Sequence, residues 1–69
     1  MNHTANYTDR IIQHDSQVWR VLSTGVVTEQ GVFCHLASVH SFRQQANGKV
    51  PYQICDYMPV MVLDRGRTV

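Results

Sequence analysis

The stretch VWRVLSTGVVTEQGVFCHLA, residues 18–37, decides the fold of this chain. Its first part, residues 18–28, is rich in β-branched residues and has no apolar repeat of 3.6 residues, so it predicts a strand. Glu29-Gln30-Gly31 predicts a tight turn, because glycine readily adopts the left-handed backbone that many hairpin turns require. Residues 32–37 then predict the returning strand of an antiparallel hairpin.

The predicted hairpin carries apolar side chains on both faces. Within residues 18–28, one face holds Val18, Leu22 and Val26, and the other holds Trp19, Val21 and Val27. Apolar groups on both faces favour a sheet that is curled or covered on each side. Gly25, in the middle of the strand, predicts a bulge or bend that would let a short sheet curl into a partial barrel.

Toward the N-terminus, the sequence predicts one more strand and a flexible end. Ile11 and Ile12 precede residues 14–17, HDSQ, which are turn-forming, so a short strand would lead into the hairpin. Residues 1–8 are mostly polar and small, and we expect them to form a flexible N-terminal segment.

Toward the C-terminus, residues 38–48 change period and predict a short helix. Ser38 is a favourable N-cap, and residues 39, 42 and 46 share one helical face. Asn47-Gly48 is typical of a helix end. Residues 52–58 alternate and predict a strand that Pro59 ends. The apolar run at 60–63 predicts a last edge strand, and residues 65–69 a C-terminal tail.

Together these elements predict an α+β domain over residues 9–64. We expect a small curled antiparallel sheet or partial barrel with one short helix, in the order β-β-β-α-β with a possible last β. The core is predicted to contain Trp19, Leu22, Val26, Leu36, Phe42 and Ile54.

The size and charge of the chain limit its functions. Of its 69 residues, 43% are hydrophobic and 16% are charged, and the formal net charge is +1. No apolar run approaches the roughly 18 residues of a membrane-spanning helix, and the first residues lack the apolar centre of a secretory signal. We therefore expect a cytoplasmic protein that does not engage membranes. A core this small favours stabilisation by a partner subunit.

A metal or thiol site is one alternative hypothesis. Cys34, His35, His40 and Cys55 are zinc-ligand types, but they lack the paired spacing of a structural zinc site. On a strand, Cys34 and His35 would also point to opposite faces. We expect two free thiols and neither metal nor cofactor, with a Cys34–Cys55 disulfide and a metal- or thiol-dependent enzyme as alternatives.

A nucleic-acid interface is the other alternative. Trp19, Phe33 and Tyr52 lie on or beside predicted strands, and bases could stack on them if they faced outward. Arg20 and Arg43 could then contact phosphates. The net charge of +1 gives little electrostatic attraction to nucleic acid, which places this hypothesis second.

The leading hypothesis is a non-catalytic interaction or regulatory module that self-associates. The chain has no glycine-rich phosphate loop and no acidic pair at helical spacing, so no catalytic residue is predicted. An unpaired edge strand at the C-terminal end would add to a protein partner or to a second copy. The candidate interface residues are Val60, Met61, Val62, Leu63, Arg43 and Gln44.

Overall fold

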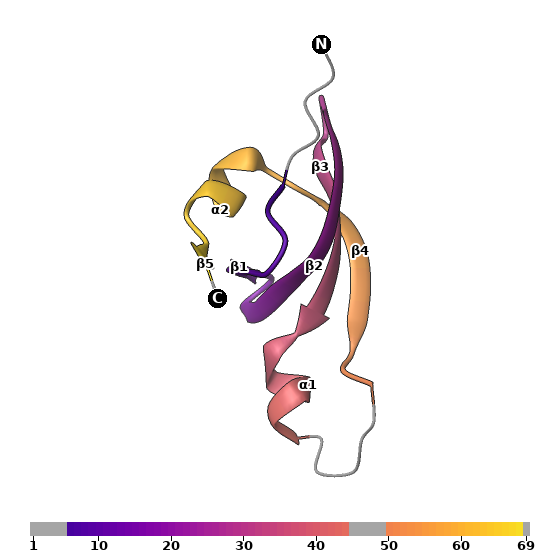
Figure 1. The fold of residues 1–69 in the computed structure, drawn as a ribbon, viewed down its shortest axis with the longest axis vertical. Coiled ribbons are helices and arrows are strands. Elements are labelled where there is room, and N and C mark those ends of the chain that lie inside the picture. Colours follow the sequence, from indigo (N-terminus) through magenta and orange to yellow (C-terminus); the bar gives the residue numbers. More distant parts are fainter. Residues whose placement is uncertain (1–5, 45–49, 69) are drawn as a thin grey trace.

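The protein is one antiparallel sheet with two short helices, as the computed structural model shows (Figure 1). The structure describes residues 6–44 and 50–68, and for residues 42–44 it describes the backbone only. The elements are β1 (Arg10–His14), β2 (Gln17–Thr28), β3 (Gly31–Ser38), α1 (Val39–Gln44), β4 (Gln53–Met58), α2 (Val60–Asp64) and β5 (Arg67–Thr68). Their order in the sheet is β4-β3-β2-β1-β5.

The predicted hairpin is confirmed as β2 and β3. Gly31 has a φ of 111°, the left-handed backbone that favours glycine. The hydroxyl of Thr28 closes the turn by donating to the carbonyl of Gly31 at 2.9 Å. The pairing register also shifts between Thr24 and Val27, so the bulge that Gly25 predicted is present.

The turn between β1 and β2 is equally tight. Asp15 and Ser16 have φ values of 51° and 63°, and His14 pairs directly with Gln17 across them. Two successive residues with positive φ are typical of a type I′ hairpin turn, whose twist matches that of the flanking strands. The turn predicted at residues 14–17 is therefore confirmed.

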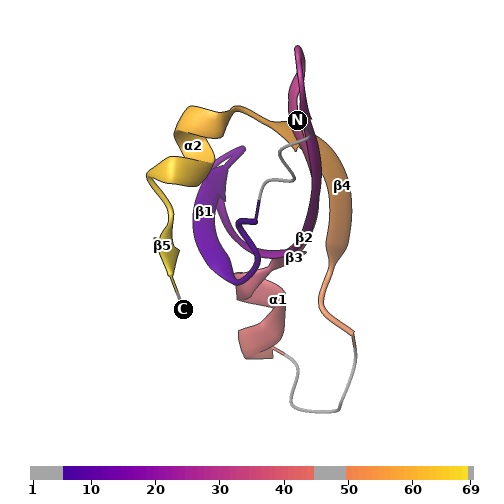
Figure 2. The same ribbon diagram turned by 45° about the horizontal axis from the view of Figure 1, so that its top comes forward.

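The sheet is open, which corrects the prediction of a curled sheet or partial barrel. β4 and β5 are its two edges, and Figure 2 shows them at opposite sides of the molecule. Closure would require these two strands to pair, but β5 has only two residues and it pairs with β1. The bulges in β2 therefore do not lead to a barrel.

Residues 60–63 form helix α2, so the predicted edge strand at this position is wrong. The carbonyl of Pro59 accepts the N–H groups of Val62 at 3.0 Å and Leu63 at 3.3 Å, which begins the helix. Leu63 is fully buried, whereas Met61 is 62% exposed. Periodicity alone cannot tell whether a short apolar run forms a strand or a buried helix. Here the helix places Leu63 in the core and leaves Met61 exposed.

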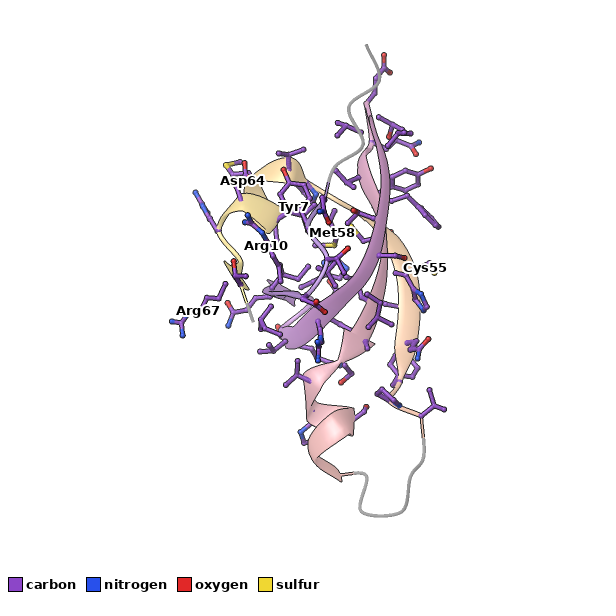
Figure 3. All side chains as sticks on the ribbon, in the orientation of Figure 1. Tyr7, Arg10, Cys55, Met58, Asp64 and Arg67 are labelled. Atoms are coloured by element: carbon purple, nitrogen blue, oxygen red, sulfur yellow. The ribbon has the colours of Figure 1, made fainter. Side chains whose placement is uncertain are left out.

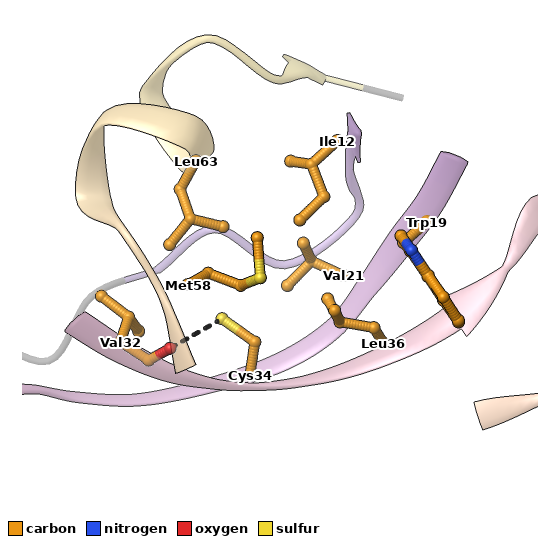
Figure 4. Close-up of a cluster of buried hydrophobic side chains, with 8 residues drawn as sticks. All are labelled: Ile12, Trp19, Val21, Val32, Cys34, Leu36, Met58 and Leu63. Atoms are coloured by element: carbon orange, nitrogen blue, oxygen red, sulfur yellow. Dashed lines mark hydrogen bonds between the residues drawn. The ribbon is translucent and has the colours of Figure 1, made fainter. Parts of the chain in front are cut away.

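The core lies between one face of β2, β3 and β4 on one side and β1 and α2 on the other (Figure 4). Its buried apolar residues are Ile12, Trp19, Val21, Val32, Cys34, Leu36, Met58 and Leu63. The indole of Trp19 donates to the carbonyl of His14 at 2.9 Å, so its polar atom is satisfied.

The predicted core is partly confirmed. Trp19 and Leu36 are buried, and Leu22 and Ile54 are half-buried. Val26 is 53% exposed, which contradicts the prediction, because it lies at the bulge near the hairpin tip. The side chain of Phe42 lies outside the described part of the structure.

Helix α1 begins where the sequence predicted. The hydroxyl of Ser38 accepts the N–H of Ser41 at 3.3 Å, as an N-cap does. The helix is described as far as Gln44, and the rest of the predicted helix lies outside the described residues. No helix of the described segments is long and apolar enough to cross a membrane.

Both ends of the described chain attach to the domain. The Tyr7 hydroxyl donates to Oδ1 of Asp64 at 3.1 Å, and Arg10 Nη1 donates to the carbonyl of Leu63 at 2.9 Å. Figure 3 shows Tyr7, Arg10 and Asp64 gathered beside α2. Tyr7 also packs against the core. Strand β5 lies within residues 65–69, for which a C-terminal tail and no strand were predicted.

Candidate functional site

Strand β4 is an open edge of the sheet and is the feature on which the candidate site is built. Its register against β3 pairs Phe33 with Tyr57, His35 with Cys55 and Ala37 with Gln53. Among the described residues, no strand pairs with the other side of β4. An edge of this kind presents unpaired peptide groups to other chains.

The direction of each peptide group of β4 follows from one hydrogen bond. The N–H of Ser38 donates to the carbonyl of Tyr52 at 2.8 Å, which makes residues 38 and 52 a hydrogen-bonded pair. In an antiparallel ladder such pairs recur at every second residue, so Ile54, Asp56 and Met58 bond toward β3. The peptide groups of Gln53, Cys55 and Tyr57 therefore point toward the open edge.

The outer face of the sheet, opposite the core, carries one aromatic pair and one polar pair beside this edge. We define it as the side chains of Phe33, His35, Gln53, Cys55 and Tyr57. The rings of Phe33 and Tyr57 meet edge to face with centroids 5.1 Å apart, yet they remain 46% and 39% exposed. His35 Nε2 lies 2.7 Å from Gln53 Oε1. Phe33 and Tyr57 are directly opposed and not hydrogen-bonded to each other, which brings their side chains close, whereas His35 and Gln53 are diagonal neighbours across the two strands.

The two cysteines are free and point to opposite faces of the sheet. Cys34 is fully buried in the core, and its thiol donates to the carbonyl of Val32 at 3.3 Å (Figure 4). Burial raises the pKa of Cys34 to about 11. Cys55 is exposed and lies on the far side of β4 from Met58 in Figure 3. A Cys34–Cys55 disulfide is therefore excluded by geometry.

A polar contact links β1 to β4. His14 Nε2 lies 3.4 Å from Oδ2 of both Asp15 and Asp56, and this buried nitrogen has no hydrogen-bond partner. The other carboxylate oxygen of Asp56 accepts the N–H of Tyr57 at 2.8 Å. Asp56 thus contacts both the interior strand β1 and a peptide group of the open edge.

The predicted protein-interface residues do not form an edge. Val60, Met61, Val62 and Leu63 belong to α2, where Leu63 is buried and only Met61 is strongly exposed. The side chains of Arg43 and Gln44 lie outside the described part of the structure. The open edge at β4 was missed because strand order does not follow from local sequence, although Pro59 did indicate where the strand ends.

Apart from Arg43, whose side chain is not described, the predicted nucleic-acid residues are not brought together on one surface. Trp19 is only 3% exposed, so bases cannot stack on it. Tyr52 is 62% exposed beside it with ring centroids 6.1 Å apart, whereas Phe33 lies on the outer face. Arg20 makes an ion pair with Asp9 at 2.9 Å, which engages its guanidinium.

The weak metal candidates are also separated. Cys34 lies in the core, His35 and Cys55 lie on the outer face, and His40 is exposed on α1. Within residues 6–44 and 50–68, no three His, Cys, Asp or Glu side chains gather as a metal site would require.

Two shallow grooves lie elsewhere on the surface. One, of about 570 Å³, runs between β1 and the end of α2, with Arg65 and Arg67 among its lining residues. The other, of about 670 Å³, lies beside the start of α1 and Tyr52. Both are open to solvent.

Compared with protein-family models, curated proteins and solved structures, the chain matches none of them. The site must therefore be interpreted from its own geometry.

Proposed function

We propose that the protein is a non-catalytic, cytoplasmic interaction module that forms a homodimer by pairing β4 with β4 of a second copy. The observation that carries this proposal is the open edge of β4, whose peptide groups at Gln53, Cys55 and Tyr57 lack a neighbouring strand among the described residues. An antiparallel pair of identical strands satisfies these groups on both copies at once.

One register uses the whole edge. If the two-fold axis passes through Cys55, each Cys55 pairs with its counterpart, and each Gln53 pairs with Tyr57 of the second copy. All outward-facing peptide groups of β4 are then bonded. This register also places Asp56 opposite Ile54, whereas an axis at Asp56 would place two carboxylates directly opposite each other, which is destabilising.

The outer face supports the same arrangement. A two-fold axis perpendicular to the sheet keeps the outer faces of both copies on the same side of the combined sheet. The two Phe33–Tyr57 pairs would then both lie next to the β4–β4 interface on that side. These rings are half exposed in the single chain. Aromatic side chains with this exposure are enriched where proteins meet, and their burial contributes to association.

The test removes one edge-facing N–H group while leaving the ladder to β3 intact. Proline lacks that group, and proline is tolerated on an edge strand where the N–H faces solvent. We expect Cys55→Pro to be monomeric in sedimentation velocity at concentrations where the wild-type chain and Cys55→Ser are dimers. A monomeric wild-type chain at millimolar concentration, or a dimeric Cys55→Pro, would contradict the proposal.

A further inference from the structure

One outward-facing donor of β4 already has a partner within the chain. The N–H of Tyr57 donates to Oδ1 of Asp56 at 2.8 Å, a hydrogen bond to a charged acceptor. Oδ2 of the same carboxylate lies 3.4 Å from His14 Nε2 on β1. Asp56 therefore makes a hydrogen bond that covers part of the open edge, and its second oxygen lies near His14.

This hydrogen bond competes directly with strand addition. In the register centred on Cys55, the N–H of Tyr57 must donate to the carbonyl of Gln53 in the second copy. The carboxylate of Asp56 has to leave that N–H first. The two-fold axis repeats the exchange, so each dimer displaces this contact on both copies.

We propose that Asp56 acts as a guard of the β4 edge: its carboxylate occupies the N–H of Tyr57 and thereby weakens strand addition. This inference rests on the proposed function, because it assigns a regulator to the same edge. Natural sheets commonly place charged side chains so that their edges resist unwanted pairing. Here the charge also binds the peptide group that the partner needs.

The surroundings of the guard provide a matched control. Asp15 also lies 3.4 Å from His14 Nε2, but its side chain is 81% exposed and it belongs to the turn between β1 and β2, not to β4. Replacing Asp15 removes the same charge as replacing Asp56. A general effect of net charge on association would therefore appear in both variants.

The first measurement is the dimer dissociation constant by sedimentation equilibrium. We expect Asp56→Ala to dimerise about tenfold more tightly than the wild-type chain, because two charge-assisted hydrogen bonds no longer need to be displaced. Asp56→Asn keeps an oxygen that can accept the Tyr57 N–H without the charge, so its constant should lie between the two. Asp15→Asn, which removes the charge but keeps a side chain that tolerates the positive φ of Asp15, should match the wild type.

The second measurement does not depend on dimerisation. Amide hydrogen exchange of Tyr57, followed by NMR at concentrations where the chain is monomeric, should be at least about tenfold faster in Asp56→Ala than in the wild type or in Asp15→Asn. Asp56→Asn serves if Asp56→Ala does not fold, and its exchange should also be faster than that of the wild type.

The outcomes separate the two proposals. Unchanged Tyr57 exchange in Asp56→Ala, or a dimer no tighter than the wild type, overturns the guard while the dimer stands. If every variant, including Asp56→Ala, is monomeric at millimolar concentration, the proposed dimer fails and the guard fails with it, even where Tyr57 exchange is faster. Tighter association together with faster exchange supports both.

Discussion

Gly31 lies where the β2–β3 hairpin turn touches the end of β4. Its φ of 111° is one that other residues adopt only with strain, and a Cβ atom placed there would lie 2.6 Å from the carbonyl oxygen of Met58. Neither neighbouring backbone can move away without disturbing the β3–β4 register. This single position therefore couples the turn to the strand that carries the candidate site.

We predict that Gly31→Ala lowers the free energy of unfolding by about 2–3 kcal/mol, from backbone strain and the clash with Met58. The measurement is urea unfolding followed by Trp19 fluorescence. Gly25→Ala is the matched control, because its added Cβ would meet the nearest atom, the Phe33 carbonyl oxygen, at an ordinary 3.6 Å. Equal losses in the two variants would contradict this account of Gly31.

The buried thiol of Cys34 gives the protein a pH dependence in the alkaline range. Burial raises its pKa from 9.0 to about 11, so the folded chain keeps a proton that the unfolded chain releases. Stability is therefore complete below about pH 9 and falls as the pH rises toward about 11, by roughly 2–3 kcal/mol for this group. Tyr7, whose pKa is raised by its hydrogen bond to Asp64, acts in the same direction.

Urea unfolding at pH 8 and pH 10.5 measures this effect. The wild-type chain should lose stability over this interval, and Cys34→Ala should lose clearly less, because the thiol is gone while Tyr7 remains. A loss of the same size in both proteins would show that Cys34 does not cause it.

At the scale of elements, the sequence predicted those whose pattern is local. The hairpin of β2 and β3 follows from β-branched residues on either side of a glycine turn, and the start of α1 follows from the N-cap at Ser38. The alternation in residues 52–58 likewise predicted the strand that the structure shows as β4. These signals depend on neighbours in the chain and survive in the folded protein.

The elements that were wrong or missed depend on distant contacts. Residues 60–63 are apolar enough for a strand, but a helix places Leu63 against Ile12 and Met58. Strand β5 forms because its two residues pair with β1. This pairing cannot be predicted from the sequence of the two residues alone. The candidate site was missed for the same reason, since only the strand order shows that β4 is an edge.

The helical form of α2 can be tested by two substitutions. In a strand, Met61 and Leu63 would point to the same face, whereas in α2 Leu63 is fully buried and Met61 is 62% exposed. We predict that Leu63→Ala costs about 2–5 kcal/mol of stability through loss of core packing. Met61→Ala should change it by less than about 0.5 kcal/mol. If the two variants lost similar amounts of stability in thermal unfolding, the helical form of residues 60–63 would be contradicted and an edge strand would be favoured.

At the scale of the whole molecule, the small core and the exposed outer face both favour association. Among the described residues, eight buried apolar side chains form the core cluster, and the Phe33–Tyr57 pair adds apolar surface on the other side of the sheet. A continuous sheet through two copies would cover the longer of the two edges. The β5 strand of each copy would then form the two edges of the combined sheet.

The same arrangement predicts a specific covalent trap. Hydrogen-bonded partners in an antiparallel pair have Cα atoms about 5.5 Å apart, which lies within the range that a disulfide spans. Mild oxidation with diamide should therefore yield a Cys55–Cys55 linked dimer, seen on a non-reducing gel. Cys34→Ala should give the same product, because the buried thiol takes no part, and a product that persists in Cys55→Ser would contradict the predicted register.

The most direct test of the β4–β4 dimer is the amide exchange rate of Cys55 as a function of protein concentration, followed by NMR. Its N–H faces the open edge in a single chain and would be bonded to the second copy in the dimer, whereas the N–H of Ile54 faces β3 in both. The account predicts that Cys55 becomes protected as concentration rises while Ile54 keeps a constant rate. A Cys55 exchange rate that is fast and independent of concentration, up to millimolar protein, would contradict it.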